Sequence, residues 1–157
     1  MTKLNVTAQP GSHEVVLTRE FNAPRDLVFK AFTDPALVPQ WWGPHEVTTI
    51  VDQMDVKHGG VWRYVQRDAQ GNEYAFRGVY HDVTAPERLV YTFEFEPMPG
   101  HILLETVTFE EQDGKTRMID HSVFQSVADR DGMISMGMEG GAAESWDRLE
   151  ALLETLK

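Results

Sequence analysis

Glu105 and His121 are the side chains of this sequence best suited to acid–base chemistry, because a carboxylate beside an imidazole can transfer protons or orient a polar ligand. Each lies in a strand-like run in which alternate residues are apolar. The simpler interpretation is a satisfied polar pair at the sheet surface, since one histidine without a nucleophile or metal partner is weak evidence of catalysis. We therefore assign no catalytic residue and favour a protein that is not an enzyme.

The turn at residues 112–114 decides whether these two side chains meet. A three-residue turn with a left-handed Gly114 places position 105 opposite position 121. A two-residue turn at Asp113-Gly114 instead pairs Val107 with Asp120, and no acid–base pair forms. The sequence allows both registers.

Two arginines could supply the polar groups of a binding site. Arg19 falls on the apolar side of its strand-like run, and Arg63 is a second candidate for an inward-facing cation. Such a guanidinium can receive a ligand carboxylate or sulfonate, or pair with an internal acid such as Asp55, and the internal salt bridge is favoured. The other histidines lack metal-ligand spacing, and no phosphate loop or dinucleotide fingerprint is present, so we expect neither a metal nor a cofactor.

Most of the residues that could line a pocket are aromatic. The pair Trp41-Trp42 can form the mouth of a pocket or plug one end of the core, because an indole combines a large apolar surface with one donor. Three consecutive strand-like runs carry an aromatic face, which is either plain core or the wall of a cavity. The predicted wall consists of Trp41, Trp42, Trp62, Tyr64, Phe76, Tyr80, Tyr91, Phe93, Val107, Met138, Ala142 and Trp146.

The elements that would hold these side chains follow from the spacing of apolar residues. Residues 15–21 alternate between apolar and polar, which predicts a first strand. Pro24 then suits a first helical turn, and the helical spacing after it ends at Asp34-Pro35. A second short helix is expected near residues 36–41.

Short β-rich runs alternate with turns from residue 45 onward. Gly, Pro, Asn and Asp mark the turns, because these residues favour tight reversals of the chain. The expected turns are 58–60, 68–72, 84–87, 97–100 and 112–114. Together with the first strand, this spacing predicts an antiparallel meander of about seven strands.

A long amphipathic helix is expected at the end of the sequence. Apolar residues recur every three or four positions from Met138 to Leu156, with acidic residues on the opposite side. A helix over 137–156 would be ~30 Å long, enough to cross a sheet. Its glycines, at 137, 140 and 141, favour a loop or a frayed first turn, while close approach to a ligand or a mobile lid is the alternative.

Several motifs in a fixed order resemble one known family from about residue 15 to the last residue. They are Arg19-x-Phe21-x-Ala23-Pro24, Val28-Phe29-x-Ala31-Phe32-Thr33-Asp34-Pro35, Trp41-Trp42-Gly43-Pro44, Asp55-Val56-Lys57-x-Gly59-Gly60-x-Trp62-Arg63, Pro86-Glu87-Arg88-Leu89-Val90 and Thr106-Val107-Thr108-Phe109. This series resembles the C-terminal domain of activators of the heat-shock-protein-ninety ATPase, within the START and polyketide-cyclase superfamily.

The resemblance implies an α+β helix-grip fold. In this fold a curved antiparallel sheet wraps around a long C-terminal helix, two short helices follow the first strand, and a pocket lies between sheet and helix. The resemblance also raises a chaperone as a partner. Full-length activators carry a separate N-terminal domain, whereas about a dozen polar residues precede the first strand here, too few for a domain. That difference argues against the chaperone role.

The composition of the chain argues against several kinds of partner, cross-link and metal site. The chain has 157 residues and a formal net charge of −11, which disfavours nucleic acids and anionic membrane surfaces as partners. Cysteine is absent, so disulfides and thiolate metal sites are excluded. No apolar run could span a bilayer, and residues 1–12 are expected to be polar and flexible, without a signal peptide. We expect one domain over 1–157, located in the cytoplasm.

These observations predict a protein that holds a small, largely apolar or aromatic ligand between the sheet and the last helix, without a cofactor. Arg19, Arg63, Glu105 or His121 would orient the ligand. The alternatives are an enzyme of cyclase or hydrolase type that uses the same pocket, or a protein-binding domain like that of the chaperone activators.

Overall fold

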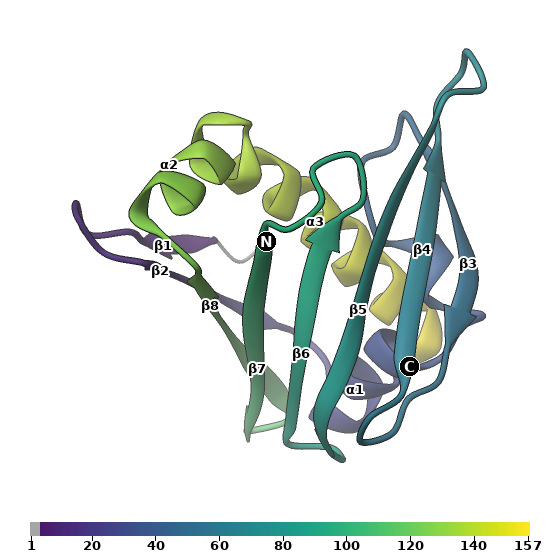
Figure 1. Ribbon diagram of the computed structural model, residues 1–157. Helices are drawn as coiled ribbons and strands as arrows, with labels where there is room; N and C mark the ends of the chain where they lie inside the picture. Colours follow the sequence, from purple (N-terminus) through teal and green to yellow (C-terminus); the bar gives the residue numbers. More distant parts are fainter. Residues whose placement is uncertain (1–3) are drawn as a thin grey trace.

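The computed structural model describes residues 4–157. It consists of an eight-stranded antiparallel sheet and three α-helices (Figure 1). The sheet order is β1-β2-β8-β7-β6-β5-β4-β3. The strands are β1 (Asn5–Thr7), β2 (Glu14–Phe21), β3 (Thr48–Met54), β4 (Val61–Arg67), β5 (Glu73–Thr84), β6 (Arg88–Phe95), β7 (Ile102–Gln112) and β8 (Lys115–Phe124). The helices are α1 (Arg25–Thr33), the short 3-10 helix η1 (Val38–Gln40), α2 (Val127–Ser135) and α3 (Met138–Leu156). The curved sheet with α3 across one face confirms the helix-grip fold.

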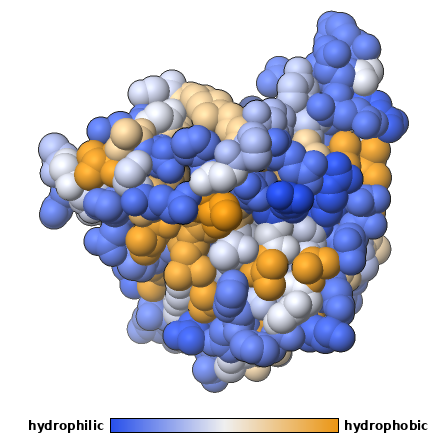
Figure 2. Space-filling model, viewed as in Figure 1, coloured by the Kyte–Doolittle hydropathy of each residue, from blue (hydrophilic) through white to orange (hydrophobic). Residues whose placement is uncertain are grey.

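The core lies between the inner face of the sheet and the helices α1 and α3. Alternate residues of the strands point inward, as the period-two pattern predicts. The fully buried side chains include Val15, Phe21, Val28, Val107, Phe109, Met118, Leu149 and Leu153. The outer face of the sheet is mostly hydrophilic, with apolar side chains gathered over β7 and β8 (Figure 2), where Leu104 lies opposite Val123. None of the described helices is long and apolar enough to cross a membrane.

The β7–β8 hairpin has the shorter of the two turns considered above. Asp113 and Gly114 both have positive φ, 55° and 75°, which is the signature of a two-residue turn whose twist matches the flanking strands. Val107 therefore pairs with Asp120. The alternative register, which places Glu105 opposite His121, is wrong.

One strand lies in a segment for which the sequence predicted flexibility. Residues Asn5–Thr7 form β1, which pairs antiparallel with β2 from Asn5 opposite Thr18 to Thr7 opposite Val16. This pairing covers the free hydrogen-bonding edge that β2 would otherwise expose. Residues 1–3, which the same prediction included, lie outside the described part of the chain.

The helical region after residue 126 is divided in two. Ser126 caps α2 by accepting a hydrogen bond from the backbone N–H of Asp129 at 3.0 Å. Gly137, with φ of 92°, separates α2 from α3. Gly140 and Gly141 lie inside α3, so the loop expected over these glycines is limited to Gly137.

The segment 41–44 is fixed between the sheet and α3. Gly43 has φ of 92°, and a Cβ atom there would lie 2.3 Å from Nε2 of Gln66, so this position requires glycine. Arg148 of α3 donates hydrogen bonds to the carbonyl oxygens of Gly43, at 2.8 Å, and Pro44, at 3.2 Å. These contacts hold Trp42 beside the inner face of the sheet.

The turn at 58–60 is structural. Gly59 has φ of 80°, and a Cβ atom on Gly60 would lie 1.9 Å from the carbonyl oxygen of Asp55. The carboxylate of Asp55 pairs with Lys57 at 3.4 Å. The left-handed backbone accounts for Gly59 and close backbone approach for Gly60, and Asp55 is not the partner of either arginine considered above.

Candidate ligand-binding cavity

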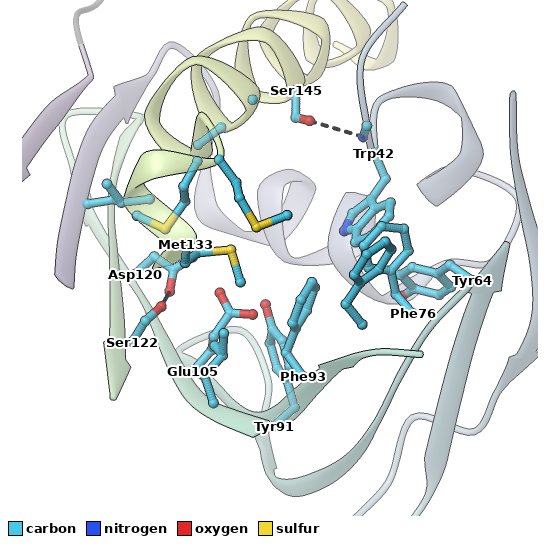
Figure 3. Close-up of a pocket in the computed structure, with 18 of the residues that line it drawn as sticks. Trp42, Tyr64, Phe76, Tyr91, Phe93, Glu105, Asp120, Ser122, Met133 and Ser145 are labelled. Carbon is cyan, nitrogen blue, oxygen red and sulfur yellow. Dashed lines mark hydrogen bonds between the residues drawn. The ribbon is translucent and has the colours of Figure 1, made fainter. Parts of the chain in front are cut away.

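A cavity of about 600 Å³ lies between the concave face of the sheet, η1 and the helices α2 and α3 (Figure 3). Its size is within the range of small-molecule sites. Strands β4 to β8 supply the floor, and α2 and α3 supply the roof. The lining is predominantly apolar and aromatic, with a few polar side chains, of which Glu105, Asp120 and Ser122 lie on β7 and β8.

Aromatic rings pack against one another along one wall of the cavity. Trp42 contacts Tyr64 and Phe76 edge to face, with ring centroids 5.1 and 5.0 Å apart. Trp62 lies 6.0 Å from Tyr91 in a perpendicular arrangement. Such edge-to-face contacts hold the rings in place, so the wall keeps its shape around the empty space.

Eleven of the twelve side chains expected in the wall line this cavity. They are Trp41, Trp42, Trp62, Tyr64, Phe76, Tyr80, Tyr91, Phe93, Met138, Ala142 and Trp146. Val107 does not belong to the lining, because it is completely buried in the core beneath. Trp41 combines both roles considered for it: it lines the cavity, and its indole Nε1–H donates to the carbonyl oxygen of Ala31 at 2.9 Å in the core.

Glu105 on β7 and Asp120 on β8 place two carboxyl groups on the floor of the cavity (Figure 3). Glu105 pairs with Ser122 in the sheet, and Asp120 lies two residues from Ser122 on the same face. The Ser122 hydroxyl donates to Oδ1 of Asp120 at 3.5 Å. A hydrogen-bonding interaction also joins Glu105 to Asp120.

The cavity raises the proton affinity of these groups. Burial raises the pKa of Glu105 well above its usual range, and the negative charge of Asp120 raises it further. Burial also raises the pKa of Asp120, to about 6, although hydrogen bonds from Glu105 and Ser122 act in the opposite direction. The pair therefore retains a proton near neutral pH. Burial likewise raises the pKa of the Tyr91 hydroxyl.

Three polar residues proposed for the pocket lie elsewhere. Arg19 is buried between β2 and α3, where Nη1 donates to Oδ1 of Asp147 at 2.7 Å. Arg63 pairs through Nε with Oε2 of Glu96 at 2.7 Å. His121 lies on the outer face of β8, and its Nε2 is 2.7 Å from Oε1 of Glu14 on β2.

The register of β8 explains the error about His121. Inward positions on this strand are occupied by Met118, Asp120, Ser122 and Phe124, all of them buried, so the odd-numbered residues between them face outward. Both arginines form internal salt bridges, which agrees with the favoured interpretation. Of the four polar candidates, only Glu105 lines the cavity.

Asp120 and Ser122 are cavity residues that the sequence analysis missed. The signal was present in the dipeptide Asp113-Gly114, which strongly favours a two-residue hairpin turn. That turn sets the pairing of β7 with β8, and the pairing decides which face of β8 looks into the cavity.

The mouth of the cavity lies between the β6–β7 loop and the junction of α2 with α3. Met98 of the loop and Met136 of the junction both line the cavity and are exposed. His101 bridges the two sides, because its Nδ1 lies 2.9 Å from Oδ1 of Asp129 on α2. Within residues 4–157, no cluster of three acidic or histidine side chains could hold a metal ion.

The fold and the cavity define a helix-grip domain of the ligand-binding or activator-like type. Residues 22–154 match the model of the family described as Activator of Hsp90 ATPase homolog 1-like protein. The chain belongs to this family.

Solved structures share the fold over almost the whole chain. Protein Ms6760 from Mycobacterium smegmatis has a TM-score of 0.87 at 24% identity, covering 98% of this chain and 97% of that one. A protein from Rhodobacter sphaeroides has a TM-score of 0.88 at 21% identity, covering 99% and 100%. A protein from Staphylococcus epidermidis has a TM-score of 0.82 at 28% identity, covering 96% and 95%. No curated protein matches the chain significantly.

Proposed function

We propose that this protein binds a small, largely apolar molecule in the cavity between the sheet and α3. The observation that carries the proposal is a cavity of about 600 Å³ whose wall is built from aromatic side chains and whose floor carries the polar side chains of Glu105, Asp120 and Ser122. Burial of apolar ligand surface would contribute ~25 cal/mol per Å², before the cost of ordering the ligand. The few polar groups would fix its orientation.

An enzyme that uses the same cavity is the second candidate. The observation in its favour is the carboxyl pair of Glu105 and Asp120, because a carboxyl that holds its proton near neutral pH can act as a general acid. We rank this candidate second because His121, the acid–base group proposed from the sequence, lies on the outer face. Recovery of a bound molecule unchanged after incubation supports binding, whereas a new product supports catalysis.

Net charge and composition support the remaining parts of the proposal. A formal net charge of −11 opposes association with nucleic acids and anionic lipid surfaces. The absence of cysteine is compatible with a reducing compartment, and we place the protein in the cytoplasm on that ground.

Tryptophan fluorescence offers a direct test, because all four tryptophans of the sequence line the cavity. The neutral probe N-phenyl-1-naphthylamine is titrated into the protein. Saturable quenching of tryptophan emission, together with an increase in probe emission, is the expected result. Absence of saturable binding by this probe and by a panel of neutral aromatic compounds would refute the proposal.

A pair of variants on α3 locates the bound probe. Ala142 lines the cavity, whereas Ala151 is exposed on the same helix. The substitution Ala142→Phe should weaken probe binding at least tenfold by filling the space, and Ala151→Phe should leave it unchanged. Equal binding by both variants would place the probe outside the cavity. Native mass spectrometry of gently purified protein then gives the mass of any molecule retained from the cell.

A further inference from the structure

We infer that the cavity selects cationic amines with an aromatic or apolar body, and that Glu105 and Asp120 receive the ammonium group. This inference rests on the proposed function and names the chemical class of the ligand. Three observations carry it: the charge of the cavity lining, the shortage of hydrogen-bond donors beside the carboxyl pair, and the aromatic rings around that pair.

The charged groups that line the cavity are acidic. Glu105, Asp120 and Asp129 line it, and the basic lining residue among the described residues is His101 at the mouth, already hydrogen-bonded to Asp129. No lysine or arginine of residues 4–157 belongs to the lining. An anionic ligand would therefore lose its hydration without meeting an opposite charge, whereas a cation meets two carboxyl groups.

Acceptors outnumber donors at the floor. Two carboxyl groups offer four oxygen atoms, and they share the hydroxyl of Ser122, which reaches Oδ1 of Asp120 at 3.5 Å and also interacts with Glu105. An ammonium group carries three N–H donors on one atom. It can therefore bridge Glu105 and Asp120, which face the same space from adjacent strands.

Aromatic rings stand beside the carboxyl groups. In Figure 3 the side chains of Tyr91, Phe93 and Glu105 extend from neighbouring strands into the same part of the cavity. Trp62 completes this group, with its ring centroid 5.9 Å from that of Phe93. A cation between aromatic faces gains cation–π attraction, which offsets part of its desolvation.

Three probes of the same shape test the charge preference. They are 2-naphthylmethylamine, 2-naphthylmethanol and 2-naphthoate, titrated at pH 7.5 with tryptophan quenching as the readout. We expect the amine to bind at least tenfold more tightly than the alcohol, and the naphthoate to bind at least tenfold more weakly than the alcohol. An alcohol that binds as tightly as the amine overturns the inference, as does failure of all three probes. If N-phenyl-1-naphthylamine still binds in either case, the proposed function stands.

Substitution of the carboxyl groups tests their role. Glu105→Gln and Asp120→Asn should each reduce the amine-to-alcohol preference at least threefold and change the affinity for the alcohol less than twofold. The matched control is Glu110→Gln, which removes a charge from an exposed residue of the same strand, paired with Arg117 outside the cavity. If Glu110→Gln also loses the amine-to-alcohol preference, the preference depends on the net charge of the protein and not on the cavity, which overturns the inference. An unchanged preference in the double variant Glu105→Gln and Asp120→Asn overturns it as well.

Discussion

At the scale of single residues, two carboxyl groups face each other across adjacent strands inside an apolar cavity. Glu105 and Asp120 cost the protein stability there, because burial opposes their ionisation. Proteins tolerate such a cost where polar groups serve a ligand. The two arginines proposed for the pocket contribute instead to internal pairs.

The first prediction concerns the pH dependence of stability. The pKa values of Glu105 and Asp120 are raised by folding, so their protonated forms stabilise the fold fully below the ordinary carboxyl pKa, near pH 4. This contribution is lost as the pH rises through the folded-state values, about 6 for Asp120. Asp120→Asn should therefore be more stable than the parent protein at pH 7.5, by about 1 to 3 kcal/mol, and Glu105→Gln should change the stability in the same direction.

Urea unfolding at pH 4.5, 6.0 and 7.5 measures this effect. The stability difference between variant and parent should shrink toward pH 4.5. Glu110→Gln, whose carboxylate is exposed, should change the curve by less than about 0.5 kcal/mol. Variants at 105 and 120 that are less stable than the parent at pH 7.5 would contradict the assigned pKa shifts.

The second prediction concerns Arg19. Its side chain is 1% exposed while that of its partner Asp147 is 48% exposed, and its Nε and Nη2 have no hydrogen-bond partner among residues 4–157. Arg19→Met should stabilise the protein by about 1 to 2 kcal/mol, because methionine fills the space without a buried charge. Asp147→Asn should destabilise it by stranding the cation. Thermal unfolding of both variants measures these changes in stability. A lower unfolding temperature for Arg19→Met than for the parent protein would show that the ion pair stabilises the fold.

At the scale of elements, the junction of α2 with α3 shapes the mouth of the cavity. Gly137 has a left-handed backbone conformation and lies where the chain passes from α2 into α3. Met136 before it and Met138 after it both line the cavity. The break in the helix therefore places flexible thioether side chains at the mouth of the cavity.

The third prediction separates the roles of the glycines. Gly140 lies inside α3, where an added Cβ atom would meet no neighbouring side chain within 4 Å, whereas Gly137 has φ of 92°. Gly140→Ala should raise the free energy of unfolding by up to ~1 kcal/mol. Gly137→Ala should lower it by about 1 kcal/mol, because alanine resists the left-handed conformation. Chemical denaturation measures the change in the free energy of unfolding for each variant. A change of the same sign in both variants would contradict the assignment of Gly137 as the break between α2 and α3.

At the scale of the whole molecule, the curved sheet and the helices α2 and α3 enclose a space that their side chains do not fill. Arg148 fastens α3 to the segment 41–44 on one side, and His101 bridges to α2 on the other. A ligand bound as proposed in this space would contact both layers, so it would bind only the folded chain.

The fourth prediction follows from that linkage. At a free concentration of 100 times its Kd, N-phenyl-1-naphthylamine should add ~2.7 kcal/mol of stability. For a chain of this size, that increment raises the unfolding temperature by roughly 5 to 10 °C. Differential scanning calorimetry provides the measurement. Ala142→Phe should show no comparable increase, and a similar shift in this variant would indicate binding elsewhere on the surface.

The sequence by itself determined the elements and the faces that they bury. The alternation in residues 15–21 and the helical spacing from Met138 to Leu156 predicted β2 and α3, because periodicity is a local property that the backbone imposes. The aromatic wall followed from the same patterns. The family motifs predicted how the sheet wraps around the helix.

Only the tertiary structure decided which polar residues enter the cavity. A one-residue difference in the β7–β8 turn reverses the face of every residue on β8, so Asp120 points inward and His121 outward. Similarly, Arg19 was correctly predicted to face inward, but its partner lies 128 positions away on α3. Register and long-range pairing arise from contacts between distant segments, and local spacing carries little information about them.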